Sequence, residues 1–471
     1  MDFPRRVPQA PDHREPSPAL AGAQRLIWEE LWTNPGESSY GVVMSSTSGG
    51  QPSRPESNEP ASGKAAGAPA ESVALKHAGR AGFLGAMFLM ATSAIGPGFL
   101  TQTTTFTVAL GAAFAFAILV SILIDIAIQL NIWRIIGISG RRAQDLANSV
   151  LPGAGFLLAA LDVFGGLVFN IGNVAGTSLG LEALFGLDVR IGGAISAAFA
   201  IAVFLVRRAG VAMDRVVVVL GVVMLALTTY VAISSSPPVG DALIESVDIG
   251  NLDANFLAIT TLIGGTVGGY IVYAGAHRMV DNGVRGVENV GEITRASVLG
   301  VLITAVMRVM LFLAVLGVVT AGATIDEGNP TASAFDAALG ETGKIVFGVV
   351  IWSAAITSVI GASYTSTSFL KVFGSWVTRW ERWVVVGFIV VSTAIFLILG
   401  TEPVRLLIFA GAFNGLILPV GLGLLLWVAW RRRDLIDGYR YPLWLVVIGS
   451  AAWLLTIYIG YKSLTGLSEL F

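Results

Sequence analysis

Long apolar stretches separated by short polar loops dominate the chain after residue 82. About eleven of them reach the ~20 residues that a helix needs to cross the hydrocarbon core of a bilayer. They centre on residues 83–110, 113–133, 154–183, 190–206, 216–234, 255–276, 298–321, 344–370, 383–400, 403–430 and 442–463. This pattern predicts an all-α membrane protein with about eleven transmembrane helices.

The loops between these stretches alternate in charge. The basic loops hold Arg134, Arg141 and Arg142; Arg207, Arg208 and Arg215; Arg278, Arg285 and Arg295; Lys371, Arg379 and Arg382; and Arg431, Arg432 and Arg433. The acidic ones hold Asp241, Glu245 and Asp248, and then Asp326, Glu327 and Asp336. Because basic loops stay on the cytoplasmic side, we expect a multi-pass protein of the cytoplasmic (inner) membrane. Its N-terminus should be cytoplasmic and its C-terminus outside.

Residues 1–79 differ in kind from the rest, being rich in Pro, Ser, Gly and Glu and lacking a sustained apolar run. This composition is typical of a disordered segment, here a cytoplasmic tail. No apolar segment typical of a signal peptide follows the first residues. Met44 is a second plausible start of translation.

The composition excludes several classes of protein. Hydrophobic residues make up 54% of the 471 positions and charged residues only 13%, against roughly 25% charged in soluble domains. The absence of cysteine excludes disulfides and thiolate metal sites, three scattered histidines exclude a His-rich site, and no basic tract suggests nucleic acid. No Ser/His/Asp, HExxH or nucleotide-binding pattern is present, so we expect neither an enzyme nor a cofactor.

A Gly-Pro-Gly triplet, Gly96-Pro97-Gly98, interrupts the apolar run 83–110 near its middle. Proline removes a backbone donor and glycine weakens a helix. Irregular backbone at this depth is tolerated only where it lines a cavity or is buried in protein. The triplet therefore predicts a broken helix and a binding site at the membrane midplane.

A second interruption, Gly264-Gly265-Thr266-Val267-Gly268-Gly269, lies five helices later. Two discontinuous helices at matching positions of inverted halves indicate a secondary-transporter site; the alternative is that small residues only let helices pack closely. We expect two inverted repeats, residues 80–235 (helices 1–5) and 236–433 (helices 6–10), followed by helix 11 in residues 434–471.

Four segments resemble the NRAMP divalent-metal transporters of the amino-acid/polyamine/organocation superfamily, over roughly residues 80–430. Ile95 to Thr101 is similar to the family's Asp-Pro-Gly-Asn segment, and Gly264 to Tyr270 falls where the family has Met-Pro-His. Between them, Gly137 to Ala147 resembles Gly-Ile-Val-Thr-Gly-Arg-Asp-Leu-Ala, and Asn170 to Gly186 resembles a segment ending Leu-Leu-Phe-Gly. The resemblance implies the LeuT-like fold, with helices 1 and 6 broken.

The departures from this family concern its metal ligands. By the resemblance, its Asp and Asn align with Gly96 and Phe99, and its Met and His with Gly268 and Tyr270. A divalent cation needs carboxylate, imidazole or thioether ligands there. We therefore expect no metal-binding residues at these positions.

The start of the second half-helix offers other chemistry. Its unpaired N–H groups and positive dipole end suit an anion, and Gly98, Thr101, Gln102, Thr104 and Thr105 surround it. The threonines could instead bond to their own helix.

Around the second interruption, the glycines at 264–269, Gly268 and Gly269 among them, are expected to clear volume for a ligand. Phe99 and Tyr270 could hold a small ring between them, although aromatic side chains in bundles also serve packing. Asn170, Asn173 and Thr177 share one stripe of the third helix. They could bind substrate or join helices by hydrogen bonds.

Charges inside predicted membrane helices are functional hypotheses by default. Asp125 and Arg308 could form an ion pair, or Arg308 could face the site. His277 could gate or titrate, or form an interfacial pair with Arg278. For coupling, the candidates for H⁺ are Asp125, Glu182 and His277, and those for Na⁺ are Thr357 and Ser358.

These observations together predict an ion-coupled secondary transporter working by alternating access. Its expected partners are a small organic solute, H⁺ or Na⁺ and the lipid bilayer; a monomer is compatible with the sequence, which leaves the oligomeric state open. One branch of NRAMP-like proteins shares the segment Gly275 to Arg278 and accompanies 5-oxoproline utilisation, so the resemblance suggests 5-oxoproline. The alternative is an NRAMP-type transporter of divalent metal ions (Mn²⁺, Mg²⁺ or Fe²⁺).

Overall fold

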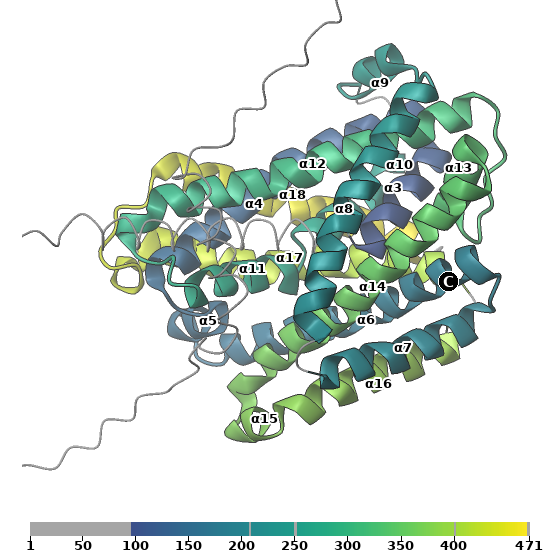
Figure 1. Ribbon diagram of the computed structural model, residues 1–471. Helices are drawn as coiled ribbons and strands as arrows, with labels where there is room; N and C mark the ends of the chain where they lie inside the picture. The colour runs from purple at the N-terminus through teal and green to yellow at the C-terminus, as the bar shows by residue number, and fades with distance from the viewer. Residues whose placement is uncertain (1–95, 207–208, 249–251, 400–401, 469–471) are drawn as a thin grey trace, which may run out of the picture. The chain divides into compact units, whose positions relative to one another are not determined.

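A computed structural model describes residues 96–206, 209–248, 252–399 and 402–468. The predicted tail 1–79 and the first half of the predicted helix 83–110 lie outside these ranges. Every regular element within them is helical (Figure 1). The all-α prediction is therefore confirmed for the described part of the chain.

The helices of the first half follow closely on one another. They are α3 (Pro97–Leu110), η1 (Gly111–Ala113), α4 (Phe114–Ser139), α5 (Ala143–Val150), α6 (Ala154–Phe185), α7 (Val189–Leu205), α8 (Ala209–Ser234) and α9 (Val239–Glu245).

The second half begins with a helix in two pieces. Its elements are α10 (Leu252–Thr266), α11 (Tyr270–Asp281), η2 (Val287–Asn289), α12 (Val290–Thr320), α13 (Pro330–Leu339), α14 (Glu341–Leu370), η3 (Lys371–Phe373), α15 (Ser375–Arg379), α16 (Glu381–Leu399), α17 (Pro403–Arg431), η4 (Arg433–Leu435) and α18 (Leu443–Ser468).

Eight helical stretches in the described ranges are long and apolar enough to cross a membrane, and the bent pair 219–234 and 239–245 would make a ninth. This number differs from eleven for two visible reasons. Residues 97–139 form one stretch of 43 residues where we predicted two helices, and α7 is a short apolar helix of 17 residues. Helix is nevertheless present in each of the eleven predicted stretches, and the count of eleven spans stays a prediction.

The half-helix α3 lies among other helices, packed against α10, α12, α13 and α17 (Figure 1). A glycine stripe on α6 brings two further helices close. A side chain at Gly176 would overlap Pro97, and one at Gly180 would lie 2.9 Å from the backbone nitrogen of Trp352 in α14. Small residues here let backbones approach. The contact at Gly176 places Pro97, the first residue of α3, directly against α6.

Candidate functional site

The half-helix α3 begins at the predicted interruption. Gly96 is its N-cap, in an extended conformation (φ −103°, ψ −173°), and Pro97 occupies the first turn. Proline suits this position because its missing N–H would be unpaired there in any case. Residues 96–104 are all buried, so this helix start is enclosed by protein in the described state.

The second interruption is shorter than predicted. Helix α10 continues to Thr266 and α11 begins at Tyr270, which leaves Val267, Gly268 and Gly269 between them. Gly269 has φ +41° and ψ −119°, a backbone conformation that residues with side chains rarely adopt. Glycine is therefore required at this position, because the chain turns here between the two half-helices.

The prediction that these glycines clear volume for a ligand is wrong for the described state. A Cβ at Gly264 would overlap the carbonyl oxygen of Gly411 in α17, and one at Gly268 would overlap the backbone of Gly264. A Cβ at Gly265 would lie 2.7 Å from Oε1 of Gln102. The glycines admit neighbouring atoms, so close helix packing accounts for part of this motif.

Arg308 brings the two interruptions together. Its side chain, on α12, is buried. The guanidinium lies 4.5 Å from the centroid of the Phe99 ring on α3, and Nη2 donates a hydrogen bond of 3.0 Å to Oγ1 of Thr266. Thr266 is the last residue of α10 before the break. A permanent positive charge therefore stands between the two half-helices.

Asp125 of α4 lies near this charge without forming an ion pair with it. Its carboxyl is buried, lies beside the same Thr266 hydroxyl and feels the charge of Arg308. In the described part of the chain, neither Arg308 nor Asp125 forms an ion pair within 4.0 Å. Arg308 therefore faces the interrupted helices, and the Thr266 hydroxyl lies between it and the Asp125 carboxyl in place of a direct ion pair. Nε of Arg308 and Oδ1 of Asp125 are buried without hydrogen-bond partners.

The polar side chains of α3 differ in whether they have hydrogen-bond partners. The hydroxyls of Thr101 and Thr105 and Oε1 of Gln102 are buried without partners, while Nε2 of Gln102 donates to the carbonyl of Leu407 at 2.8 Å. Thr104 instead accepts a hydrogen bond of 3.1 Å from Thr331 of α13. Three unpaired acceptors or donors therefore remain near the start of this helix.

The asparagines of α6 divide between the two predicted roles. Nδ2 of Asn170 donates to Ser363 at 3.1 Å and to Ser392 at 3.0 Å, which joins α6 to α14 and α16. Asn173 has a buried Nδ2 without a partner, and Thr177 donates to the backbone of its own helix. Helix joining explains Asn170, and only Asn173 keeps a donor available.

The two aromatic rings have different neighbours. Phe99 stacks on Arg308, whereas the ring of Tyr270 packs edge-on against Phe169 with centroids 5.6 Å apart. The predicted arrangement of Phe99 and Tyr270 around one ring-shaped ligand is therefore not the arrangement of the described state.

The residues predicted to bind a coupling ion differ in their burial and in their hydrogen bonds. Thr357 and Ser358 are only partly buried, and the Thr357 hydroxyl donates to its own helix backbone. The Glu182 carboxylate accepts a hydrogen bond of 3.1 Å from Asn329. His277 is buried by protein, and its Nε2 accepts the backbone N–H of Ala143 at 2.9 Å. The predicted interfacial pair with Arg278 stays a prediction.

Asp162 was missed by the sequence reasoning. It lies on α6, is 1% exposed, and has a carboxylate oxygen without a hydrogen-bond partner. Its neighbour is Tyr273 of α11, whose hydroxyl is likewise buried and unpaired and feels the charge of Asp162. The rule that intramembrane charges are functional hypotheses applies to Asp162 as it does to Asp125, and could have found it.

The described residues contain no group of three or more His, Cys, Asp or Glu side chains that could hold a metal ion. Around the two interruptions the side-chain groups are amides, hydroxyls, one guanidinium and the single carboxyl of Asp125. The donors among these groups suit an electron-rich ligand better than a cation.

Comparisons with known proteins show which family the chain is similar to. A family model described as natural resistance-associated macrophage protein-like (Nramp) matches residues 87–466. The uncharacterized membrane protein YcsG of Bacillus subtilis is 53% identical over 367 residues, covering 78% of this chain and 90% of that protein. An uncharacterized membrane protein of Haemophilus influenzae is 51% identical over 367 residues, covering 78% and 91%.

Solved structures share the fold at low identity. A manganese transporter of Eremococcus coleocola matches with TM-score 0.64 and 18% identity, covering 83% of this chain and 87% of that one. MhsT in complex with L-phenylalanine matches with TM-score 0.60 and 15% identity, covering 82% and 98%. These likenesses show that the fold is the LeuT-like fold that the sequence predicted.

Proposed function

Because this chain belongs to the Nramp family, we propose that it is a secondary transporter that moves a small organic anion across the membrane by alternating access. The proposed site lies between the start of α3 and the break from α10 to α11. Its suggested ligand groups are the backbone N–H groups after Gly96, the side chains of Thr101 and Gln102, and the guanidinium of Arg308.

The observation that carries this proposal is the place of Arg308. A cation that is 2% exposed and only 4.5 Å from the Phe99 ring centroid would repel a divalent metal ion at that depth, where charges are weakly screened. The same cation, with an unpaired Nε, would attract a carboxylate. The helix start adds partial positive charge from the same side.

A divalent metal ion is the second candidate, and the comparisons favour it over 5-oxoproline. The Eremococcus coleocola neighbour is a manganese transporter, and the Nramp family is that of metal transporters by the resemblance given above. For this candidate, Asp125 would be the nearest carboxylate. MhsT, a neighbour of the same fold, was solved with L-phenylalanine, so the fold accommodates organic solutes as well.

Uptake into proteoliposomes separates the two candidates. We expect the purified full chain to accumulate a radiolabelled small carboxylate, with 5-oxoproline as the first compound, under an inward H⁺ or Na⁺ gradient. Saturable Mn²⁺ uptake without carboxylate uptake would overturn the proposal.

The double variant Asp125→Asn/Arg308→Gln is the matched test of the site, because it removes both charges together and leaves neither one buried alone. Hydrogen bonds to charged groups contribute about 1.5–3 kcal/mol, so carboxylate uptake should fall about 10- to 100-fold. If Mn²⁺ were the cargo, the same double variant should lower Mn²⁺ uptake because it removes the Asp125 carboxylate, and the wild-type chain should show no carboxylate uptake for the variant to reduce.

A further inference from the structure

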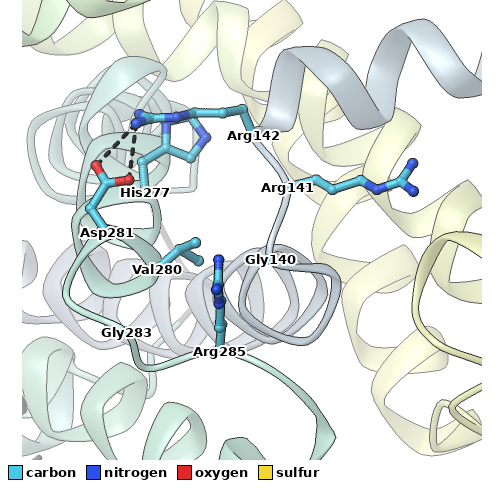
Figure 2. A pocket seen from close by; sticks show the side chains of 8 residues that line it. All are labelled: Gly140, Arg141, Arg142, His277, Val280, Asp281, Gly283 and Arg285. Carbon is cyan, nitrogen blue, oxygen red and sulfur yellow. Dashed lines mark hydrogen bonds and ion pairs between the residues drawn. The ribbon is translucent and has the colours of Figure 1, made fainter. Parts of the chain in front are cut away.

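A pocket of about 340 Å³ lies away from the two helix interruptions, where the end of α4 meets the far end of α11 (Figure 2). Its wall includes Arg141, Arg142, Arg285, His277 and Asp281. By the charge pattern of the loops, this is the cytoplasmic face. The volume falls within the range of small-molecule sites, roughly 300–1,000 Å³.

The pocket has an excess of positive charge. Three arginines and one aspartate line it, so its cations outnumber its anions by two. Arg142 is engaged, since its Nη2 lies 3.0 Å from both carboxylate oxygens of Asp281. Arg285 forms no ion pair within the described part of the chain, and Figure 2 shows its side chain projecting between Gly140 and Val280 toward the pocket.

The backbone holds Arg285 in this position. The N–H of Gly286 donates to the carbonyl of Gly137 at 2.9 Å, which ties the segment after α11 to the end of α4. Gly140 has φ +62°, and a side chain there would lie 3.4 Å from Cδ of Arg285. The distance is an ordinary contact, so the stem of Arg285 lies over this turn, and the positive φ is what favours glycine there.

His277 supplies an independent sign of a ligand. Its ring is 4% exposed, and Nε2 accepts the N–H of Ala143. Because a backbone N–H can only donate, the proton of the neutral ring must be on Nδ1. Nδ1 is buried and has no partner in the described part of the chain, so a residue that lines the pocket has an enclosed donor without an acceptor.

We propose that this pocket binds a phosphate group, from either an anionic phospholipid headgroup or a soluble phosphate compound. Guanidinium groups pair with phosphate through two parallel hydrogen bonds, which Arg285, without an ion pair in the described part of the chain, can supply. The excess of two positive charges suits a phosphate group, either a monoester with −1.5 to −2 near pH 7 or the singly charged phosphodiester of a lipid headgroup. Basic pockets between transmembrane helices on the cytoplasmic side are known to bind lipid headgroups. The site is separate from the proposed cargo site and stands whichever cargo is moved.

Thermal unfolding of the purified full chain in non-ionic detergent tests the soluble source. Inorganic phosphate should raise Tm by a few degrees in a saturable manner, because a ligand of the folded state stabilises it. Chloride and acetate at equal ionic strength should not. Arg285→Gln should abolish the shift, while the control Arg295→Gln, which removes an exposed arginine of the same predicted face outside the pocket, should retain it.

Nanodiscs test the lipid source. In phosphatidylglycerol nanodiscs, the Tm of the wild-type chain should exceed that in phosphatidylcholine nanodiscs, and Arg285→Gln should remove the difference. A shift with inorganic phosphate alone assigns a soluble ligand, and a shift with phosphatidylglycerol alone assigns a headgroup. The proposal is overturned if neither shift occurs, if acetate matches phosphate, or if Arg295→Gln loses the shift as Arg285→Gln does.

Discussion

Arg308 and Phe99 form the contact that distinguishes this chain at the residue scale. A charged side chain is costly inside a membrane and persists there when it is paired or functional. Here it is stacked on an aromatic ring, bonded to Thr266 and separated from the buried Asp125 carboxyl by that same threonine. The sequence could identify Arg308 and Asp125 as intramembrane charges. It could not identify Thr266 as the link between them, because the rotation of one helix against another is not encoded in any local pattern.

Gly269 offers a test of the second interruption. We expect Gly269→Ala to lower stability by at least about 1–2 kcal/mol, since φ +41° is unfavourable for a residue with a Cβ. The added carbon would also lie 2.7 Å from Oδ1 of Asn414. Thermal unfolding and transport both measure the effect. Gly361→Ala on α14 is the control, because nothing lies within 4 Å of a Cβ there; equal losses in the two variants would contradict this account.

Asp162 is the residue we expect to couple transport to protons. Its unpaired, buried carboxylate next to Tyr273 can gain and lose a proton without leaving a cation partner behind. Asp162→Asn keeps the shape and removes the titration. Cargo exchange should therefore continue in this variant, while accumulation driven by a pH gradient should be lost. The exposed Asp241→Asn should behave as the wild type does, and gradient-driven accumulation by Asp162→Asn would exclude this role.

At the scale of elements, the pairing of α10 with α17 depends on backbone contact. Gly264 faces Gly411 and Gly415 with no room for a side chain. Overpacking such an interface costs about 1–3 kcal/mol, so Gly264→Ala should lower Tm and reduce transport. Gly291→Ala on α12, with open space around its Cβ position, should leave Tm unchanged. An unchanged Tm in Gly264→Ala would mean that the two helices separate easily.

Element boundaries were largely predictable because glycine, proline and charged loops mark them. The predicted stretches 154–183 and 403–430 correspond to α6 at 154–185 and α17 at 403–431. The second interruption was predicted too long, at 264–269. Three of these six residues are helical, and glycines that serve interhelical packing have the same appearance in a sequence as glycines that break a helix.

At the scale of the whole molecule, the orientation in the membrane is a prediction from loop charges. The chain contains no cysteine, so single-cysteine variants can be labelled without background. Glu327→Cys, in an exposed loop predicted to be outside, should react with an impermeant maleimide on intact cells. Asn282→Cys, in an exposed loop predicted to be cytoplasmic, should react only after permeabilisation. The opposite pattern would invert the topology.

The proposed cargo site, with Arg308 as a cation and Asp125 ionised, has an electrical consequence. An empty site with one positive and one negative charge does not move in the membrane potential as it reorients, whereas a site loaded with a monovalent carboxylate has a net charge of −1. An inside-negative potential opposes its inward movement by about 2.3 kcal/mol per 100 mV. One co-transported proton makes the loaded step voltage-independent, and a second makes voltage drive it inward. Under a potassium diffusion potential, the sign and size of the substrate-induced current therefore report how many cations accompany each solute.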